Sequence, residues 1–245
     1  MRTVVLCIFI FLSFMFKKIT SKGIPEVDII VAPGGFKGIY MFGICHYVKN
    51  HFCLEHKKVA GFSCGSLNAL FLKIRPELDH KYLKKMFEIN QKTSMKRLLR
   101  DVLQKHRTIF TKDDFKLEDV RIGVTTIKGV ELFQDFLSLD DAIRCCKASC
   151  FVPFITWNDI FVVYKNRLTL DGGVFFKALD INKNTLVIRS SMFGRYKDNI
   201  PAGFIKPNCS YYQLYLNGYN DARKNHAYFK QFLMEKPPQT QPQAD

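Results

Sequence analysis

The sequence is poor in acidic residues and has no long hydrophobic run. Its 245 residues include 22 Asp and Glu against 37 Lys and Arg, for a formal net charge of +15. This imbalance favours anionic partners, either nucleic acid or an acidic lipid surface. No segment reaches the roughly 20 consecutive apolar residues of a membrane-spanning helix, which excludes a polytopic membrane protein. A hydrophobic content of 47% excludes a wholly disordered chain.

The eight cysteines lack the spacing of a metal or redox site. No pair is arranged as C-x-x-C, and two are adjacent, Cys145 and Cys146. We therefore expect mostly reduced, buried thiols, as in a protein that faces the cytoplasm. No acidic cluster of the EF-hand kind is present, and no metal or cofactor is predicted.

Motifs for nucleotides and nucleic acids are also missing. The chain contains neither G-x-x-x-x-G-K-[ST] nor G-x-G-x-x-G, so nucleotide-binding loops have little support. Its concentrated basic residues are not interleaved with aromatic ones, and no nucleic-acid reading motif occurs. We predict no nucleic-acid partner.

An apolar leader opens the sequence. Residues 3–16 (TVVLCIFIFLSFMF) are uncharged and are followed directly by Lys17 and Lys18. As a helix they would span roughly 21 Å, short of a hydrocarbon core of about 30 Å. We interpret residues 1–22 as a membrane anchor or signal-like segment. An anchor predicts membrane association facing the cytoplasm, and a cleaved signal predicts secretion. A buried strand is the structural alternative.

From residue 27 onward, strand-like and helix-like patterns alternate, which is typical of an α/β fold. No internal repeat or long linker divides the chain, so we predict one domain over residues 23–236 and a disordered Pro/Gln-rich tail, 237–245. Strands are expected at 27–32, 57–62, 120–127, 160–164, 168–170 and 185–190, and helices from the first glycine turn to about residue 50 and over 66–74, 140–150 and 213–235.

The positive charge is concentrated in residues 81–107, which carry nine Lys and Arg and two acidic residues. An apolar stripe at helical spacing runs through this segment: Met95, Leu98, Leu99, Val102 and Leu103. A basic amphipathic helix can rest on an anionic membrane with its apolar face dipped in. The alternative is a surface helix whose stripe packs on the sheet.

The first motif with chemical content is G-x-S-x-G, formed by Gly61, Ser63 and Gly65 between an expected strand and an expected helix. A sharp strand–serine–helix turn requires a strained backbone at the serine, and the glycines let strand and helix approach closely. The hydroxyl then lies at a helix N-terminus, which favours developing negative charge. A serine N-cap in a glycine turn is the structural alternative.

Two further turns complete the candidate site. A glycine turn at 33–38 follows the first strand, and its backbone N–H groups suit an oxyanion hole. Asp171, Gly172 and Gly173 follow another strand, where an aspartate is well placed to face a cleft. Taken alone, each turn is compatible with an ordinary structural role.

Together these motifs resemble the patatin-like phospholipases. The resemblance extends from about Asp28 to at least Asp180, with weaker similarity at 218–222. Residues 34–40 (GGFKGIY) are similar to the family's glycine-rich oxyanion loop, and residues 61–68 (GFSCGSLN) to its nucleophile elbow. Ala148, Ser149, Cys150 and Pro153 match its A-S-x-x-x-P segment, and residues 171–173 its D-G-[AG] motif.

The resemblance implies a three-layer α/β/α sandwich with a mainly parallel sheet, and a Ser–Asp dyad without histidine. Ser63 would be the nucleophile and Asp171 the general base, with an oxyanion hole from Gly34, Gly35, Lys37 and Gly38. It implies phospholipid or lysophospholipid substrates and an anionic membrane surface as partner. An aspartate acts as base here only when it is partly desolvated.

Two residues depart from the family pattern. Pro33 has no N–H, but it precedes the two glycines assigned as donors. Cys64 is bulkier than the alanine that usually follows the nucleophile, so we expect it to narrow the acyl site.

Two other functions stay open at the level of sequence. The order Ser63, Asp171, His226 formally matches the triad of an α/β-hydrolase esterase, although the elbow comes early for that fold. A catalytically silent membrane-surface protein would use the leader and the basic helix as two membrane signals.

Overall fold

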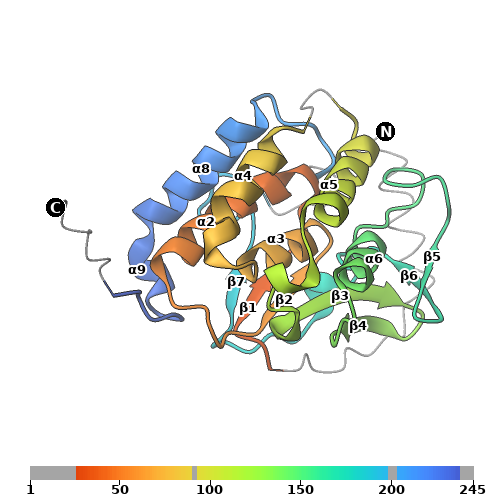
Figure 1. Ribbon diagram of the computed structural model, residues 1–245, viewed down its shortest axis with the longest axis horizontal. Coiled ribbons are helices and arrows are strands. Elements are labelled where there is room, and N and C mark those ends of the chain that lie inside the picture. Colours follow the sequence, from red (N-terminus) through yellow and green to blue (C-terminus); the bar gives the residue numbers. More distant parts are fainter. Residues whose placement is uncertain (1–25, 90–92, 198–202, 238–245) are drawn as a thin grey trace.

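The computed structural model describes residues 26–89, 93–197 and 203–237 (Figure 1). The leader at 1–22 lies outside the described residues, as does the tail after Pro237. The chain is an α/β protein with a mixed, mostly parallel seven-stranded sheet. No helix within the described ranges is both long and apolar enough to span a bilayer.

Four parallel strands form the centre of the sheet. They are β1 (Ile29–Val31), β2 (Val59–Phe62), β3 (Val120–Thr126) and β7 (Leu186–Ile188), in the order β3-β2-β1-β7. Three antiparallel strands extend it: β4 (Gly129–Phe133), β5 (Val162–Tyr164) and β6 (Arg167–Leu170). Functional loops therefore gather at the shared carboxyl edge of the parallel strands.

Strands β2 and β6 meet end to end along one edge of β3. Strand β4 pairs with residues 122–126 of β3, from the pair Ile122 and Phe133 to the pair Thr126 and Gly129. It therefore occupies one edge of β3 over that length. On the other edge, β2 pairs with β3 up to Gly123, and β6 takes over at Thr125. Because β2 and β6 run in opposite directions, the residues that follow them arrive beside the same part of β3.

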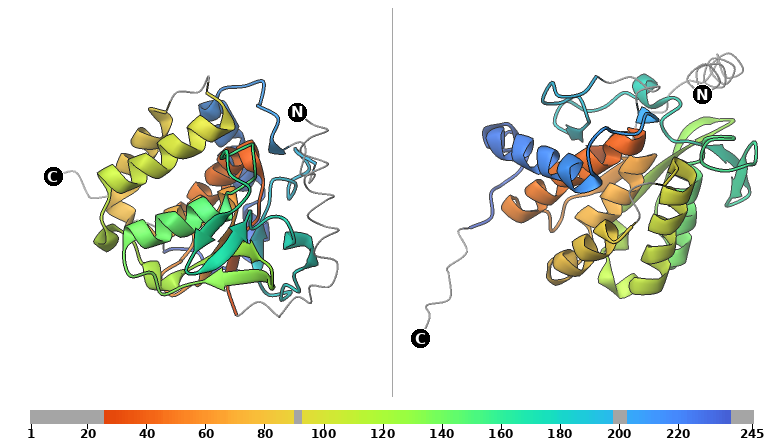
Figure 2. Two further views of the ribbon diagram at one scale, coloured as in Figure 1. Left: turned by 90° about the vertical axis from the view of Figure 1, so that its right-hand side faces the viewer. Right: turned by 90° about the horizontal axis from the view of Figure 1, so that it is seen from above.

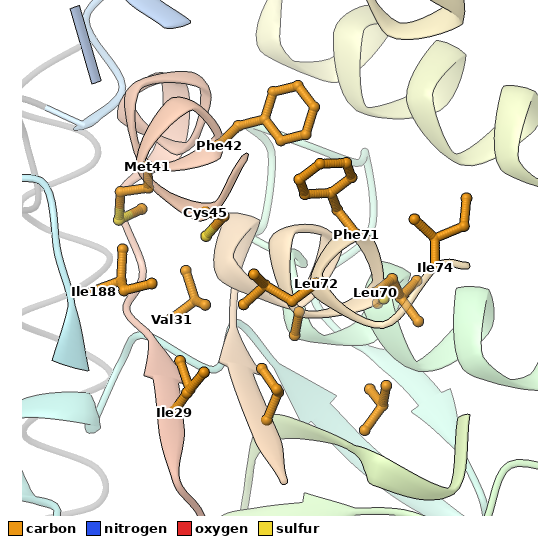
Figure 3. Close-up of a cluster of buried hydrophobic side chains, with 14 of the residues drawn as sticks. Ile29, Val31, Met41, Phe42, Cys45, Leu70, Phe71, Leu72, Ile74 and Ile188 are labelled. Carbon is orange, nitrogen blue, oxygen red and sulfur yellow. The ribbon is translucent and has the colours of Figure 1, made fainter. Parts of the chain in front are cut away.

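The larger core lies between the sheet and the helices. Helices α2 (Gly38–His51), α3 (Cys64–Leu72), α6 (Leu139–Ser149) and α8 (Tyr211–Lys224) contribute to it. Ile29 and Val31 point to this face, and Ile30 points to the other, as strand alternation requires. Figure 3 shows side chains of α2 and α3 above those of β1 and β7, and α2 runs beside α8 in Figure 1.

A smaller apolar cluster covers the opposite face of the sheet. Ile30, Ala60 and Phe62 pack there against Phe176, which belongs to the short 3-10 helix η5 (Phe176–Ala178). Figure 2 shows the labelled helices of Figure 1 gathered on one side of the sheet, with the segment after β6 on the other.

The basic segment forms two helices, α4 (Asp79–Phe87) and α5 (Met95–Ile109). Leu98, Leu99 and Leu103 are buried, so the apolar stripe of α5 faces the protein interior. The apolar side of α5 is therefore buried in the protein, as expected for a surface helix and not for a helix that dips this side into a membrane. The stripe lines a cavity between helices and does not pack mainly on the sheet.

The expected elements are present with shifted ends, and one predicted helix needs correction. The closing helix, expected over 213–235, is broken at Asn225 into α8 and α9 (His226–Phe229), because the Asn225 side chain donates to the carbonyl of Asp221 and caps the first helix. Strand β4 was not expected. The seven described cysteines are free thiols.

Candidate active site

Ser63 lies in a strained turn between β2 and α3. Its φ of 53° and ψ of −131° are unfavourable for a residue with a Cβ atom, and such a conformation costs roughly 1–3 kcal/mol. The Ser66 amide and hydroxyl both donate to the Ser63 carbonyl, at 2.9 and 2.6 Å, and hold the turn. This is the sharp elbow that the G-x-S-x-G motif predicts.

The glycines of the elbow are required by close backbone contacts. A Cβ atom on Gly61 would lie 2.3 Å from the carbonyl oxygen of Gly65, and one on Gly65 would lie 2.2 Å from that of Val31. Any side chain at either position would push β2, α3 and β1 apart. The two glycines therefore fix how the nucleophile is presented.

Asp171 contacts Ser63 directly. The Ser63 Oγ donates to Asp171 Oδ2 over 2.7 Å, and Asp171 Oδ1 accepts the Gly173 amide, also over 2.7 Å. The two side chains come together because β6 ends where β2 ends. Ser63 is 7% exposed and Asp171 is 4% exposed.

Burial tunes the carboxylate. Desolvation raises the pKa of Asp171 to about 6, while the hydrogen bonds from Ser63 and Gly173 oppose the rise. A carboxylate with a pKa in this range is a better proton acceptor than an exposed aspartate, and it is still ionised at neutral pH. The pair can therefore deprotonate the serine as it attacks a carbonyl carbon.

Ser149 ties the two halves of the site together. Its hydroxyl accepts the Ser63 amide at 2.8 Å and donates to the Gly123 carbonyl at 2.6 Å, and its own carbonyl accepts the Gly172 amide at 2.9 Å. A Cβ atom on Gly172 would lie 2.1 Å from the Gly123 carbonyl oxygen. The sequence placed Ser149 in a motif but gave it no role, because its partners are remote in the chain.

The glycine turn forms the 3-10 helix η1 (Gly35–Lys37) in front of α2. Among the described residues, the amides of Gly34 and Gly35 have no backbone acceptor, and the only group that they act on is the neighbouring Cys64 thiol, so they are the candidate oxyanion donors. The Lys37 amide instead donates to the Gly34 carbonyl at 3.0 Å, and the Gly38 amide to those of Gly35 and Phe36. This corrects the expectation that Lys37 and Gly38 also donate to the oxyanion.

The Lys37 side chain makes a hydrogen bond elsewhere, and Gly38 leaves room for a neighbouring side chain. Lys37 Nζ donates to the Lys197 carbonyl at 2.7 Å. A Cβ atom on Gly38 would lie 2.8 Å from the Sγ of Cys64, so this glycine makes room for the cysteine beside the nucleophile.

Cys64 faces the donors of the oxyanion hole. Burial raises the pKa of its thiol to about 12, the nearby Asp171 carboxylate adds to the rise, and the amides of Gly34 and Gly35 oppose it. A Cβ atom on Gly34 would lie 3.7 Å from the Cys64 Sγ, so the sulfur lies beside the glycine turn. A carbonyl oxygen that enters the hole has to share this space with Cys64.

His226 is not part of the site. Its Nδ1 pairs with the Tyr47 hydroxyl at 2.8 Å and its Nε2 pairs with Glu235, so both ring nitrogens are engaged elsewhere. None of the described histidines lines either cavity at Ser63. The geometry therefore does not assemble the Ser–Asp–His triad that the order of residues allowed.

Two cavities meet at Ser63 and Asp171. The first has a volume of about 130 Å³ and runs between α2, α3, α4 and α5. Its wall is mainly apolar and includes Ile39, Phe42, Leu67, Met86, Phe87, Leu98 and Val102. The second has a volume of about 540 Å³ and is more polar. The Ser63–Asp171 pair thus lies between an apolar and a polar compartment.

No metal centre is evident in the part of the chain that the structure describes, where no three His, Cys, Asp or Glu side chains gather suitably. A scan against protein-family models found none that matches the chain, and a search of curated proteins found no match either.

Proposed function

We propose that the chain is a lipid acyl hydrolase of the patatin-like type, which cleaves phospholipids or lysophospholipids. The single observation that carries the proposal is the 2.7 Å hydrogen bond from Ser63 Oγ to Asp171 Oδ2 at the end of an apolar cavity. The cavity suits an acyl chain, and its inner end presents the ester carbonyl to the serine.

The proposed reaction has two stages. As the Ser63 oxygen bonds to the ester carbonyl carbon, Asp171 takes the hydroxyl proton, and the amides of Gly34 and Gly35 stabilise the oxyanion. The carbon–oxygen bond to the alcohol then breaks, and Asp171 returns the proton to the departing oxygen. Water attacks the acyl-enzyme with Asp171 again as base, and the fatty acid leaves as Ser63 regains its proton.

A three-layer α/β/α sandwich is the architecture we propose for residues 23–236. Support comes from the apolar clusters on both faces of the sheet, one against α2, α3 and α6 and the other around Phe176. The order of the glycine loop, the elbow and the Asp171 turn along the chain supports the patatin-like assignment.

Membrane association, with the protein facing the cytoplasm, is part of the same proposal. Helix α5 lines the acyl cavity with Leu98 and Val102, while Arg97 and Arg100 are exposed. An anionic surface would attract these arginines next to the cavity that takes the acyl chain. The leader at 1–22 would supply a second membrane signal.

A catalytically silent lipid-binding protein is the second candidate. One observation favours it: the Cys64 sulfur occupies the space in front of the Gly34 and Gly35 amides. The intact Ser63–Asp171 pair favours the enzyme, because lipid binding alone needs neither the strained serine nor a buried carboxylate.

Acyl release from mixed anionic phospholipid vesicles by the full chain tests the proposal. We expect Ser63→Ala and Asp171→Asn to lower release by at least roughly a thousandfold, and His226→Ala to retain it. Circular dichroism establishes that each variant is folded. A fluorophosphonate should label the wild type and fail to label Ser63→Ala.

Release that survives Ser63→Ala would overturn the dyad, and loss of release in a folded His226→Ala protein would revive the triad. Vesicle binding without release or serine labelling would establish the silent protein instead.

A further inference from the structure

The polar cavity meets the apolar one at Ser63 and Asp171, and the rest of its wall comes from other segments of the chain. It shares Gly35, Ser63, Asp171 and Phe204 with the apolar cavity. Its remaining wall comes from the glycine turn, the segment that follows Asp171, and the end of β7. A lipid whose ester lies at Ser63 and whose acyl chain fills the apolar cavity would place its other end here.

The charge of this cavity is strongly positive. Among the described residues, Lys37, Lys177 and Arg189 line it, and Asp171 is the one acidic residue of its described wall; Asp171 is already hydrogen-bonded to Ser63. The described wall of the apolar cavity contains no basic residue. The two compartments therefore differ in the chemistry they accept, with an anion favoured only in the polar one.

Sheet register fixes the position of Arg189. Val31 pairs with Ile188, and the Ala32 amide donates to the Ile188 carbonyl at 2.9 Å, so Arg189 follows β7 directly beside the start of the glycine turn. Since the sheet order is β2-β1-β7, Ser63 and Arg189 follow strands two places apart. That separation is roughly 10 Å between backbones, which a glycerol phosphate and an arginine side chain can bridge.

The N–H groups of the Arg189 guanidinium are available to bind an anion. No hydrogen bond or ion pair links its guanidinium to another residue within the described ranges, although it is partly buried. The next residue, Ser190, also lines the cavity, is 2% exposed, and its hydroxyl has no partner among the described side chains and carbonyls. A guanidinium fork matches phosphate oxygens in geometry and charge.

We propose that Arg189, with Ser190 and the positive charge of Lys177, forms a phosphate-binding subsite for the head group of the lipid substrate. This inference rests on the proposed acyl hydrolase and names the residues that would bind the phosphate of its lipid substrate. A neutral acylglycerol would leave the guanidinium partly desolvated without a counter-charge, so the site discriminates against it.

Paired substrates with the same acyl chain test the subsite. We compare kcat/KM for monomeric lysophosphatidylglycerol and monoacylglycerol, because monomers remove any effect of membrane binding. We expect the wild type to prefer the phosphate ester, and Arg189→Gln to lower its kcat/KM at least roughly tenfold. The same variant should raise kcat/KM for monoacylglycerol, because no desolvated charge remains in the subsite. Arg223→Gln, an exposed arginine of α8 outside both cavities, is the matched control and should change neither.

A binding measurement separates this proposal from the proposed function. Calorimetry with Ser63→Ala protein compares lysophosphatidate, glycerol phosphate and inorganic phosphate, and the double variant Ser63→Ala/Arg189→Gln serves as reference. We expect lysophosphatidate to bind most tightly and to lose at least roughly tenfold in affinity without Arg189.

Several outcomes would overturn the subsite. Lysophosphatidate binding that is indifferent to Arg189 would do so whether or not the protein is a hydrolase. Inorganic phosphate that binds as tightly as lysophosphatidate would identify a site for free phosphate. Arg189-dependent binding in a protein that releases no acyl group would instead support the subsite and refute the proposed hydrolysis.

Discussion

Ser149 holds the backbone of Ser63 through its side chain. The Ser149 hydroxyl accepts the Ser63 amide hydrogen at 2.8 Å and passes its own hydrogen to the Gly123 carbonyl at 2.6 Å. Ser149 is completely buried at the end of α6. This one hydroxyl therefore links the turn at Ser63 to β3, and β3 also pairs with β6, the strand that precedes Asp171.

Removal of this hydroxyl should loosen the nucleophile. Ser149→Ala leaves the Ser63 amide and the Gly123 carbonyl buried without a partner, at a cost of roughly 1–3 kcal/mol for each group. We expect a lower free energy of unfolding and a kcat reduced roughly tenfold or more, with KM little changed because no cavity wall is altered. Urea unfolding and steady-state acyl release measure the two effects.

The matched control for Ser149 is Ser138→Ala. Ser138 caps the other end of α6 by accepting the Asp141 amide at 3.1 Å. Its removal should cost about 1 kcal/mol of stability and leave kcat unchanged. If Ser149→Ala and Ser138→Ala lowered stability but neither lowered kcat, Ser149 would have a structural role only.

Activity should rise with pH through the titration of Asp171. Desolvation raises the pKa of this carboxyl to about 6, and only its ionised form accepts the Ser63 proton. We expect kcat/KM to increase from about pH 4.5 and to level off above about pH 7. The pH dependence of fluorophosphonate labelling should follow the same curve. A rise centred near pH 4 would mean that Asp171 is not the base or is not desolvated.

Acid should destabilise the fold through His106. This residue is buried on α5 between the Tyr82 hydroxyl and the Val102 carbonyl, and burial lowers its pKa to about 4. Below about pH 6.5 the unfolded chain takes up a proton that the folded protein refuses, so stability falls until about pH 4. The loss is on the order of 3 kcal/mol for this one histidine.

Urea titrations at several pH values measure this loss. His106→Gln should flatten the dependence between about pH 6.5 and pH 4, whereas His80→Gln, at an exposed position of α4, should leave it as in the wild type. Protonation of Asp171 acts in the opposite sense, because its folded pKa is raised and the folded state takes up that proton first. An unchanged slope in His106→Gln would contradict the assignment.

The sequence predicts the central strands and the elbow because their signals are local. Ile29 to Val31 is a short apolar run before glycines, and Ser63 lies between glycines at a strand–helix junction. The glycines on both sides of Ser63 mark this sharp turn in the sequence, although the strained conformation itself is held by contacts with the rest of the fold. The alternation of strands and helices likewise identifies the α/β class without knowledge of any contact.

Other features depend on contacts that no local pattern reveals. Strand β4 follows a two-residue hairpin loop, Ile127 and Lys128, which lacks the Asn or Gly that usually marks such a turn. The Lys37 and Gly38 amides donate to carbonyls of the 3-10 turn and are therefore not available to an oxyanion, which the residue pattern does not reveal. The end-to-end meeting of β2 and β6 depends on how three strands share the edges of β3, so the approach of Asp171 to Ser63 was predicted by resemblance and not by pattern.

Cys64 should slow the first chemical step. Its sulfur faces the Gly34 and Gly35 amides, so it competes with the carbonyl oxygen for the oxyanion hole. We expect Cys64→Ala to speed acylation of Ser63, measured by stopped-flow labelling with a fluorophosphonate, and the larger side chain of Cys64→Val to slow it. Cys53→Ala, which removes a thiol outside both cavities, is the control. Equal rates in all four proteins would mean that the sulfur leaves the hole open.

The apolar wall of α5 should set the acyl-chain preference. Leu98 lines the cavity together with Met95 and Val102 and packs in the cluster that contains Phe36. Because a larger side chain at this position fills space that the acyl chain needs, Leu98→Trp should shift kcat/KM from palmitoyl toward octanoyl lysophospholipids by roughly tenfold or more. Gln104→Trp places the same side chain at an exposed position of α5 and should leave the preference unchanged. Equal shifts in the two variants would mean that tryptophan acts through the membrane surface, and no shift in either would place the acyl chain outside this cavity.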